Sequence, residues 1–212
     1  MTRRSVVPYE ALVLPVGHDV GARSVSPSGR LHQVRVGSEV MDLTDPEYVV
    51  WALAHGIAAD DRPMRRTLAE RTASYGLDRR DSGMTIDRFL DDGLLIEVGA
   101  EPNSAIEFAR HHQLIPLAFG LGPDPDHPGL LLVGALGQPL AQLSAPMYDL
   151  WTWAHLSPNL WQGCEEAVAV AQRQGVTNPG ELDPELVLGG VVAALHDLLR
   201  VRAAYLDRRA AR

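Results

Sequence analysis

The side chains with the most potential for metal or acid–base chemistry are eight histidines spread along the chain. His111 and His112 are adjacent, so on a helix their side chains point about 100° apart and are poorly placed to share one metal ion. His55 and His155 each follow a tyrosine and a tryptophan at helical spacing, which is typical of a hydrogen-bonded histidine in a core. Because no HExxH motif is present, the histidines predict no metal site.

An acidic loop around His127 has side chains that suit a cation. Asp124 and Asp126 precede the histidine, and carboxylate oxygens are good ligands for hard cations. The loop lacks the fixed ligand spacing of a calcium-binding hand, and its prolines are typical of a rigid connector. The sequence leaves open whether Asp124–His127 holds a cation. Neither a metal nor an organic cofactor is predicted.

Cys164 is the only cysteine of the chain, so no internal disulfide and no cysteine-based zinc site are expected. The neighbouring Glu165 and Glu166 would raise the pKa of its thiol, which opposes a role as nucleophile. The sequence also lacks a Walker loop, a GxSxG motif and a GxGxxG motif. An enzyme is therefore the least favoured class of function, and no catalytic residue is predicted.

Six arginines form the one basic cluster, which suggests contact with the phosphates of duplex DNA. They are Arg62, Arg65, Arg66, Arg71, Arg79 and Arg80. The helix expected to read the DNA offers only Thr85 and Arg88 against several aspartates, which equips it poorly for a major groove. The formal net charge of −8 also disfavours nucleic acid and anionic membranes as partners. A DNA-binding transcriptional regulator is the alternative function.

The elements that position these residues are indicated by a segment that occurs twice. Leu43–His55 and Leu143–His155 share Leu, Pro, Tyr, Trp, Ala and His at the same offsets, and Thr44 is replaced by Ser144. A hydroxyl residue followed by a proline in the first turn is typical of a helix start. Two such starts in 212 residues predict two units, residues 1–99 and residues 100–212.

The pattern of the first unit predicts a small antiparallel sheet followed by three helices. The expected strands are 11–16, 31–36 and 39–43, with a loop rich in Gly, Ser and Pro as far as residue 29. The expected helices are 45–55, 63–75 and 81–92, each followed by a glycine, before a short strand at 94–98.

The second unit predicts the same order of elements, with a longer last helix. After a link at 99–113, strands are expected at 114–119 and 130–133, and helices at 145–155 and 160–174. The last helix begins at Pro184 and is expected to run past Tyr205. Its apolar stripe is consistent with packing across the two units or with a homodimer formed through this helix.

The first unit resembles a small winged-helix domain, and more narrowly the PqqD-like (RiPP recognition element) variant, in which a hairpin precedes three helices. The matching residues are Val40–Leu43 before the capped helix, then Ile86, Phe89 and Leu90 running to Gly93-Leu94-Leu95. The resemblance covers residues 31–98 and extends less closely to the second copy. It implies an α+β fold of two tandem winged-helix-like units.

The resemblance also implies a non-catalytic protein that binds an extended peptide beside the third strand and against the third helix, which is β-augmentation. The peptide-binding residues would be Val40, Met41, Ile86, Phe89 and Leu90. A peptide or protein partner is therefore the first expectation, and an accessory subunit of a biosynthetic enzyme is the second alternative. The sequence has no apolar run long enough for a membrane span and no signal-peptide core, so a cytoplasmic protein is expected.

Overall fold

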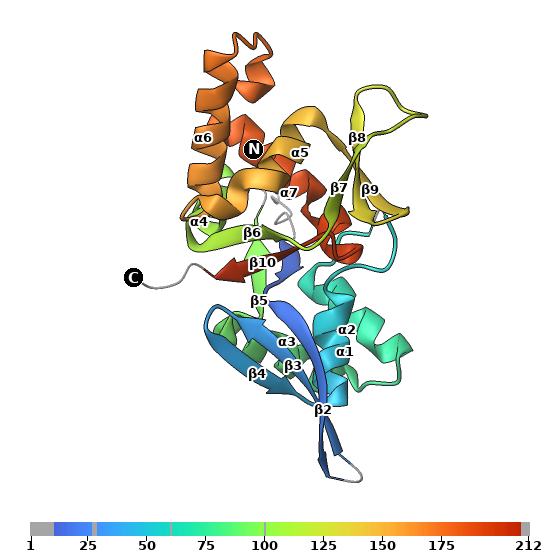
Figure 1. The fold of residues 1–212 in the computed structure, drawn as a ribbon. Coiled ribbons are helices and arrows are strands. Elements are labelled where there is room, and N and C mark those ends of the chain that lie inside the picture. Colours follow the sequence, from blue (N-terminus) through green and yellow to red (C-terminus); the bar gives the residue numbers. More distant parts are fainter. Residues whose placement is uncertain (1–10, 27–28, 60, 100, 209–212) are drawn as a thin grey trace, which may run out of the picture.

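The computed structural model describes residues 11–26, 29–59, 61–99 and 101–208. The fold is α+β (Figure 1). We call residues 11–99 the first half and residues 101–208 the second half. The first half contains β1 (Leu12–Pro15), β2 (His18–Ser26), β3 (Gly29–Val36), β4 (Glu39–Leu43), α1 (Asp45–Leu53), α2 (Arg65–Ser74), α3 (Arg79–Asp92) and β5 (Leu95–Val98).

The second half begins with a linking helix, α4 (Pro102–His111), and then repeats this order. It contains β6 (His112–Pro116), β7 (Phe119–Pro123), β8 (Leu130–Ala135), β9 (Gln138–Ser144), α5 (Ala145–Trp153), the short turn η1 (Ala154–Leu156), α6 (Leu160–Arg173), the short turn η2 (Pro179–Glu181), α7 (Pro184–Arg200) and β10 (Ala204–Arg208). Within the described residues, no helix is both long and apolar enough to cross a membrane.

All strand pairs of these sheets are antiparallel. In the first half β2, β3 and β4 form a three-stranded sheet in that order, and in the second half β7, β8 and β9 do the same. The outer strands of each half pair with each other, β1 with β5 and β6 with β10. Apart from the linking helix α4, each half therefore starts and ends at one two-stranded ribbon, with its sheet and its three helices between.

The two repeated helix starts become α1 and α5, as predicted. At the start of α1, the amide of Thr44 donates to Glu47 Oε2 at 2.7 Å, which is one bond of a capping box. The two tryptophans of the repeat are buried, and their indole N–H groups donate to main-chain oxygens at 3.1 Å, Trp51 to Val16 and Trp151 to Ala203. The tryptophans are thus hydrogen-bonded core residues, which is the usual state of a buried indole.

The prediction of a loop between residues 17 and 29 was wrong, because β2 occupies residues 18–26 and pairs with β3. The pairing register shifts between Asp19 and Gly21, and Gly21 has a φ of +105°. The Asp19 carboxylate accepts a hydrogen bond from the Gly21 amide at 2.9 Å. A bulge uses the same residue types as a turn, so the composition of this segment hid a strand.

The prediction that the last helix runs past Tyr205 was also wrong. The helix α7 ends at Arg200, and Tyr205 lies in β10. Arg202 has a φ of +55°, and the amide of Ala203 donates to Leu198 O at 2.9 Å. This is the left-handed ending of a Schellman motif, in which glycine is the usual residue. The sequence has arginine there, so the stop signal was absent from the composition.

The end of α7 and the strand β10 pack against the first half. His196 Nε2 lies 3.2 Å from Val13 O, and the amide of Gly17 donates to Leu206 O at 2.7 Å. One apolar core runs through both halves. The stripe of α7 contributes five side chains that are at most 1% exposed, Leu188, Val191, Leu195, Leu198 and Leu199. The apolar content of this helix therefore serves packing within the chain, and a homodimer through it stays a prediction.

Arg202 also joins the two halves through its side chain. Its guanidinium donates to Asp19 Oδ2 at 3.1 Å and to the Tyr48 hydroxyl at 3.3 Å, and that hydroxyl donates to Asp19 Oδ2 at 2.6 Å. A non-glycine residue in the left-handed region costs about 1–2 kcal/mol. The arginine thus combines an unfavourable backbone conformation with side-chain contacts that glycine would lack.

Replacing Arg202 separates these two effects. Arg202→Ala and Arg202→Gly both lose the contacts with Asp19 and Tyr48, but only alanine keeps the backbone strain. We expect the free energy of unfolding of Arg202→Ala to lie about 1 kcal/mol below that of Arg202→Gly. Urea denaturation of the two variants measures the difference, and equal stabilities would contradict the account of the left-handed turn.

Candidate functional site

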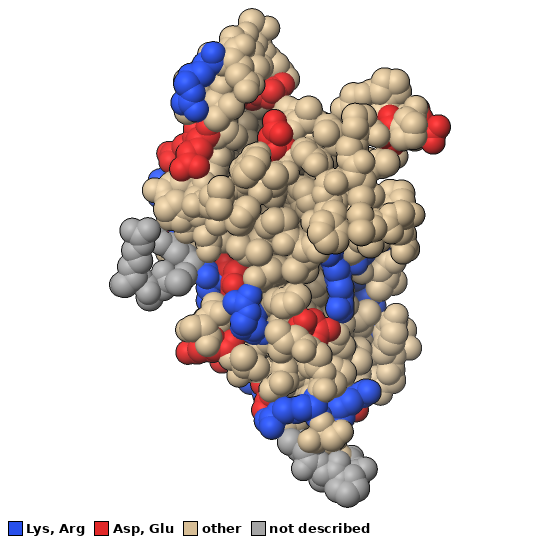
Figure 2. Space-filling view, in the orientation of Figure 1, with Lys and Arg blue, Asp and Glu red and all other residues tan. Residues whose placement is uncertain are grey.

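Five of the six arginines of the predicted DNA-binding alternative form ion pairs with carboxylates. The ion pairs are Arg62 with Asp197 (3.4 Å), Arg65 with Asp87 (3.1 Å) and Glu97 (3.3 Å), Arg66 with Glu70 (3.5 Å), Arg71 with Asp61 (2.5 Å) and Arg79 with Glu70 (3.0 Å). Arg80 lies in the first turn of α3, where its amide donates to the Asp78 carboxylate at 2.8 Å. Figure 2 shows basic and acidic side chains interspersed over the first half. A DNA phosphate would have to compete with these carboxylates, and the DNA prediction has no structural observation in its favour.

The peptide-binding residues predicted in the first half divide into exposed and buried ones. Val40 on β4 is 53% exposed, and Met41 and Leu90 are partly buried. Ile86 and Phe89 have no exposed surface and belong to the core. A peptide beside β4 would therefore meet Val40 and Met41 but not Ile86 or Phe89. The site in the first half stays a prediction.

In the acidic loop the carboxylate oxygens of Asp124 are already engaged by neighbouring residues of the chain. Asp124 Oδ1 accepts from the amide of Asp126 at 2.9 Å, and Asp124 Oδ2 accepts from Gln142 Nε2 at 2.5 Å and lies 3.0 Å from His127 Nδ1. The hydrogen bond from Asp126, and then the contact with His127, lower the pKa of Asp124. Among the described residues no group of three or more His, Cys, Asp or Glu side chains could hold a metal ion.

Cys164 lies on α6 and is fully buried. Burial, together with the negative charge of Glu165, raises the pKa of its thiol to about 12. The thiol is therefore protonated at neutral pH, and a protonated thiol is a poor nucleophile.

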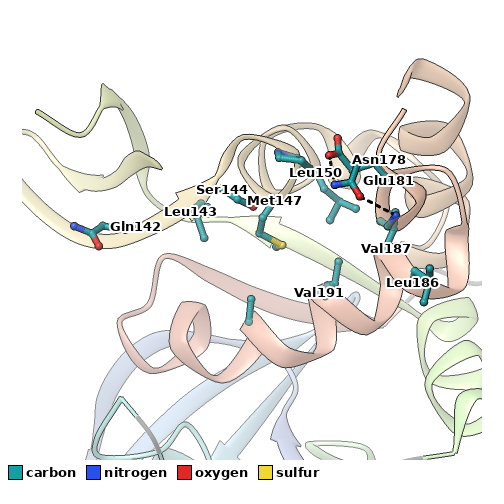
Figure 3. Close-up of a pocket in the computed structure, with 14 residues that line it drawn as sticks. Gln142, Leu143, Ser144, Met147, Leu150, Asn178, Glu181, Leu186, Val187 and Val191 are labelled. Atoms are coloured by element: carbon teal, nitrogen blue, oxygen red, sulfur yellow. Dashed lines mark hydrogen bonds between the residues drawn. The ribbon is translucent and has the colours of Figure 1, made fainter. Parts of the chain in front are cut away.

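An open groove of about 480 Å³ lies in the second half, between β9 and the start of α5 on one side and α7 on the other (Figure 3). It is lined by Gln142, Leu143, Ser144, Pro146, Met147, Leu150, Asn178, Gly180, Glu181, Leu186, Val187, Gly190, Val191 and Ala194. Leu143, Leu150 and Val191 are buried and form its floor. Leu186 on the rim is 56% exposed. We call this cavity the β9–α7 groove.

The secondary structure around the groove is fixed by local interactions. Ser144 and Pro146 start α5, and Asp183 caps α7 by accepting from the amide of Glu185 at 2.8 Å. At η2, Asn178 Nδ2 donates to Glu181 Oε1 at 2.8 Å, so Glu181 has a neutral partner. The strand β9 pairs only with β8 in its described sheet. Its other edge is therefore available for hydrogen bonds to an added strand.

Two glycines in the middle of α7 are the sequence feature that could have pointed to this groove. Gly189 and Gly190 are exposed and lie between Leu188 and Val191 of the apolar stripe. Each interior glycine costs a helix about 1 kcal/mol relative to alanine. A Cβ atom added at either position would meet nothing within 4 Å. Packing within the chain therefore does not explain them, and Gly190 lines the groove. The sequence predicted a peptide site in the first unit alone and gave no prediction for this groove.

In the first half, the helices α1 and α3, which correspond to α5 and α7, are joined by an ion pair. Arg88 of α3 donates to Glu47 Oε1 of α1 at 2.6 Å. In the repeated segment Met147 stands at the position of Glu47. The second half thus has a flexible apolar side chain on the groove wall where the first half has a charged bridge.

Neither protein-family models nor curated proteins nor solved structures gave a match to this chain. A function must therefore be inferred from the groove itself and from the charges around it.

His55 at the end of α1 is held in its neutral form. Its Nδ1 lies 3.2 Å from the main-chain oxygens of Trp51 and Ala52, and its ring meets the Trp51 ring edge-on at 4.5 Å between centroids. Burial, followed by the positive charge of Arg202, lowers the pKa of His55 from 6.5 to about 4. Protonation thus favours the unfolded chain.

This pKa predicts a loss of stability in mild acid. As the pH falls from 6.5 to 4, the unfolded chain takes up a proton that the folded chain does not. The free energy of unfolding should therefore drop by up to about 3 kcal/mol from His55 alone, and this contribution should level off below pH 4. Denaturation of His55→Asn, which cannot titrate, should show a smaller loss over this window. The same substitution at exposed His111 is the control, and a loss unchanged in His55→Asn would refute the assignment.

Proposed function

We propose that the protein is a non-catalytic binding module that captures an extended peptide segment of a partner protein in the β9–α7 groove. The observation that carries this proposal is the combination of a strand edge and an apolar floor along one cavity. An added strand would form main-chain hydrogen bonds with β9 and place alternate side chains on Leu143, Leu150 and Val191. Main-chain hydrogen bonds to β9 would thus hold the partner as a strand, and contacts of its side chains with the floor would give specificity.

The order of elements supports this placement. In our proposal the two halves are tandem winged-helix-like units that resemble PqqD-like domains, because a small antiparallel sheet precedes three helices in each. The groove then lies between the third strand and the third helix of the second unit. That is where the resemblance implies that a peptide binds.

The chemistry of the lining favours binding over catalysis. Glu181 is the only ionisable side chain among the residues of the groove. Nucleophilic and general acid–base mechanisms need a reactive group with a second group within hydrogen-bonding reach. The volume of about 480 Å³ falls in the range of ordinary ligand sites. A groove with one carboxylate and an apolar floor suits recognition.

The two glycines of α7 provide a matched test. A displayed library of random peptides is selected on the full chain, and the affinity of the enriched peptides is measured by fluorescence polarisation. Gly190→Leu places a side chain in the groove, so we expect it to weaken binding by about tenfold or more. Gly189→Leu makes the same change next to the groove, and its affinity should stay within about twofold of the original.

Both variants should gain a few tenths to about 1 kcal/mol of stability from helix propensity, so loss of folding would not explain a difference. Amide chemical shifts of β9 should move when the peptide is added. The proposal fails if the library yields no peptide, or if the enriched peptides bind Gly190→Leu as well as the original chain.

A further inference from the structure

The arginines of the protein are unevenly distributed along the chain. Between residues 113 and 199 the chain has nine aspartates and glutamates but a single Lys or Arg, which is Arg173. Figure 2 shows that the visible face of the second half carries mainly acidic side chains where it is charged. In the first half the carboxylates are interspersed with arginines and paired with them, as described above. Few cationic side chains therefore offset the carboxylates that lie near the β9–α7 groove.

Several of these carboxylates lie in or next to the groove. Glu181 lines it, Asp183 and Glu185 are in the first turn of α7 beside Leu186, and Asp149 precedes Leu150 on α5. Within the described ranges, none of these carboxylates has an ion pair with an arginine or a histidine. Glu181 is partly buried, and its neutral partner Asn178 leaves its charge uncompensated.

These observations decide which kind of segment the groove accepts. A carboxylate without a cationic partner attracts a positive group, and it does so more strongly where water is partly excluded. An acidic segment would be repelled, and a neutral one would gain only the apolar contacts and the strand pairing. Figure 3 shows Gln142 and Glu181 at opposite ends of the lining, so apolar residues of a bound strand would lead up to the carboxylate.

We infer that the partner segment is an apolar, cationic strand, with a Lys or Arg side chain on Glu181 and aliphatic side chains on the floor formed by Leu143, Leu150 and Val191. This inference rests on the proposed function and adds the chemical class of the partner. The basic residue sets the direction and register of the strand, because a slip by one residue would move it to the opposite face.

The test uses the peptides selected on the full chain. We expect them to share one Lys or Arg next to aliphatic residues. Replacing that residue with Gln should weaken binding by about tenfold, and replacing it with Glu should weaken it further. Raising the ionic strength should weaken binding of the cationic peptide more than binding of its Gln analogue.

Glu181→Gln keeps an acceptor for Asn178 and removes the charge. It should therefore weaken binding of the cationic peptide about tenfold and leave the affinity for the Gln analogue unchanged. Glu165→Gln makes the same change in net charge on the exposed surface of α6, away from the groove, and should change affinity by less than about twofold.

The outcomes separate this inference from the proposed function. Peptides that bind the groove, lose affinity in Gly190→Leu, yet show no preference for Lys or Arg would overturn the inference and leave peptide binding intact. An equal effect of Glu181→Gln and Glu165→Gln would also overturn it, because only net charge would then matter. A dimer detected by light scattering and abolished by Gly190→Leu would identify a second copy as the occupant and refute the cationic partner.

Discussion

The position of the groove depends on one buried carboxylate at the junction of the two halves. Asp207 in β10 is only 7% exposed, and it accepts hydrogen bonds from the Gly37 amide at 2.6 Å and from Arg35 at 3.1 Å. A buried carboxylate is costly unless it is paired in this way. Because both donors belong to the first half, β10 must dock there, and α7, which leads into β10, is held in place with it.

The helix α7 consequently contributes to two surfaces, the contact with the first half and the wall of the groove. Its C-terminal part packs against the first half, where His196 reaches Val13 O and Asp197 pairs with Arg62. Its N-terminal part carries Val187, Gly190 and Val191 along the groove. The contact between the halves therefore sets the wall of the groove, although the first half contributes none of the lining residues. The third helix of the first half instead joins α1 through a salt bridge.

Most helices and strands were predictable because their signals are local. The expected helix starts at 45 and 145 depend on a hydroxyl residue and a proline within three positions, and α1 and α5 begin there. The failures at β2 and at the end of α7 have local causes as well. The bulge of β2 at Gly21 has the composition of a turn, and α7 ends at a left-handed arginine where glycine is the usual residue. In both places tertiary contacts of Asp19 or Arg202 stabilise a conformation that composition does not indicate.

The sequence by itself determined the α+β class and the repeated helix starts, because composition and short-range spacing suffice for these. Only the tertiary structure decided which apolar surfaces stay uncovered. Ile86 and Phe89 of the predicted peptide site are buried in the core. The groove is formed by β9 and α7, which are forty residues apart in the chain. Apolar side chains of a helix stripe all look alike in sequence, and whether one is core or binding surface depends on what packs against it.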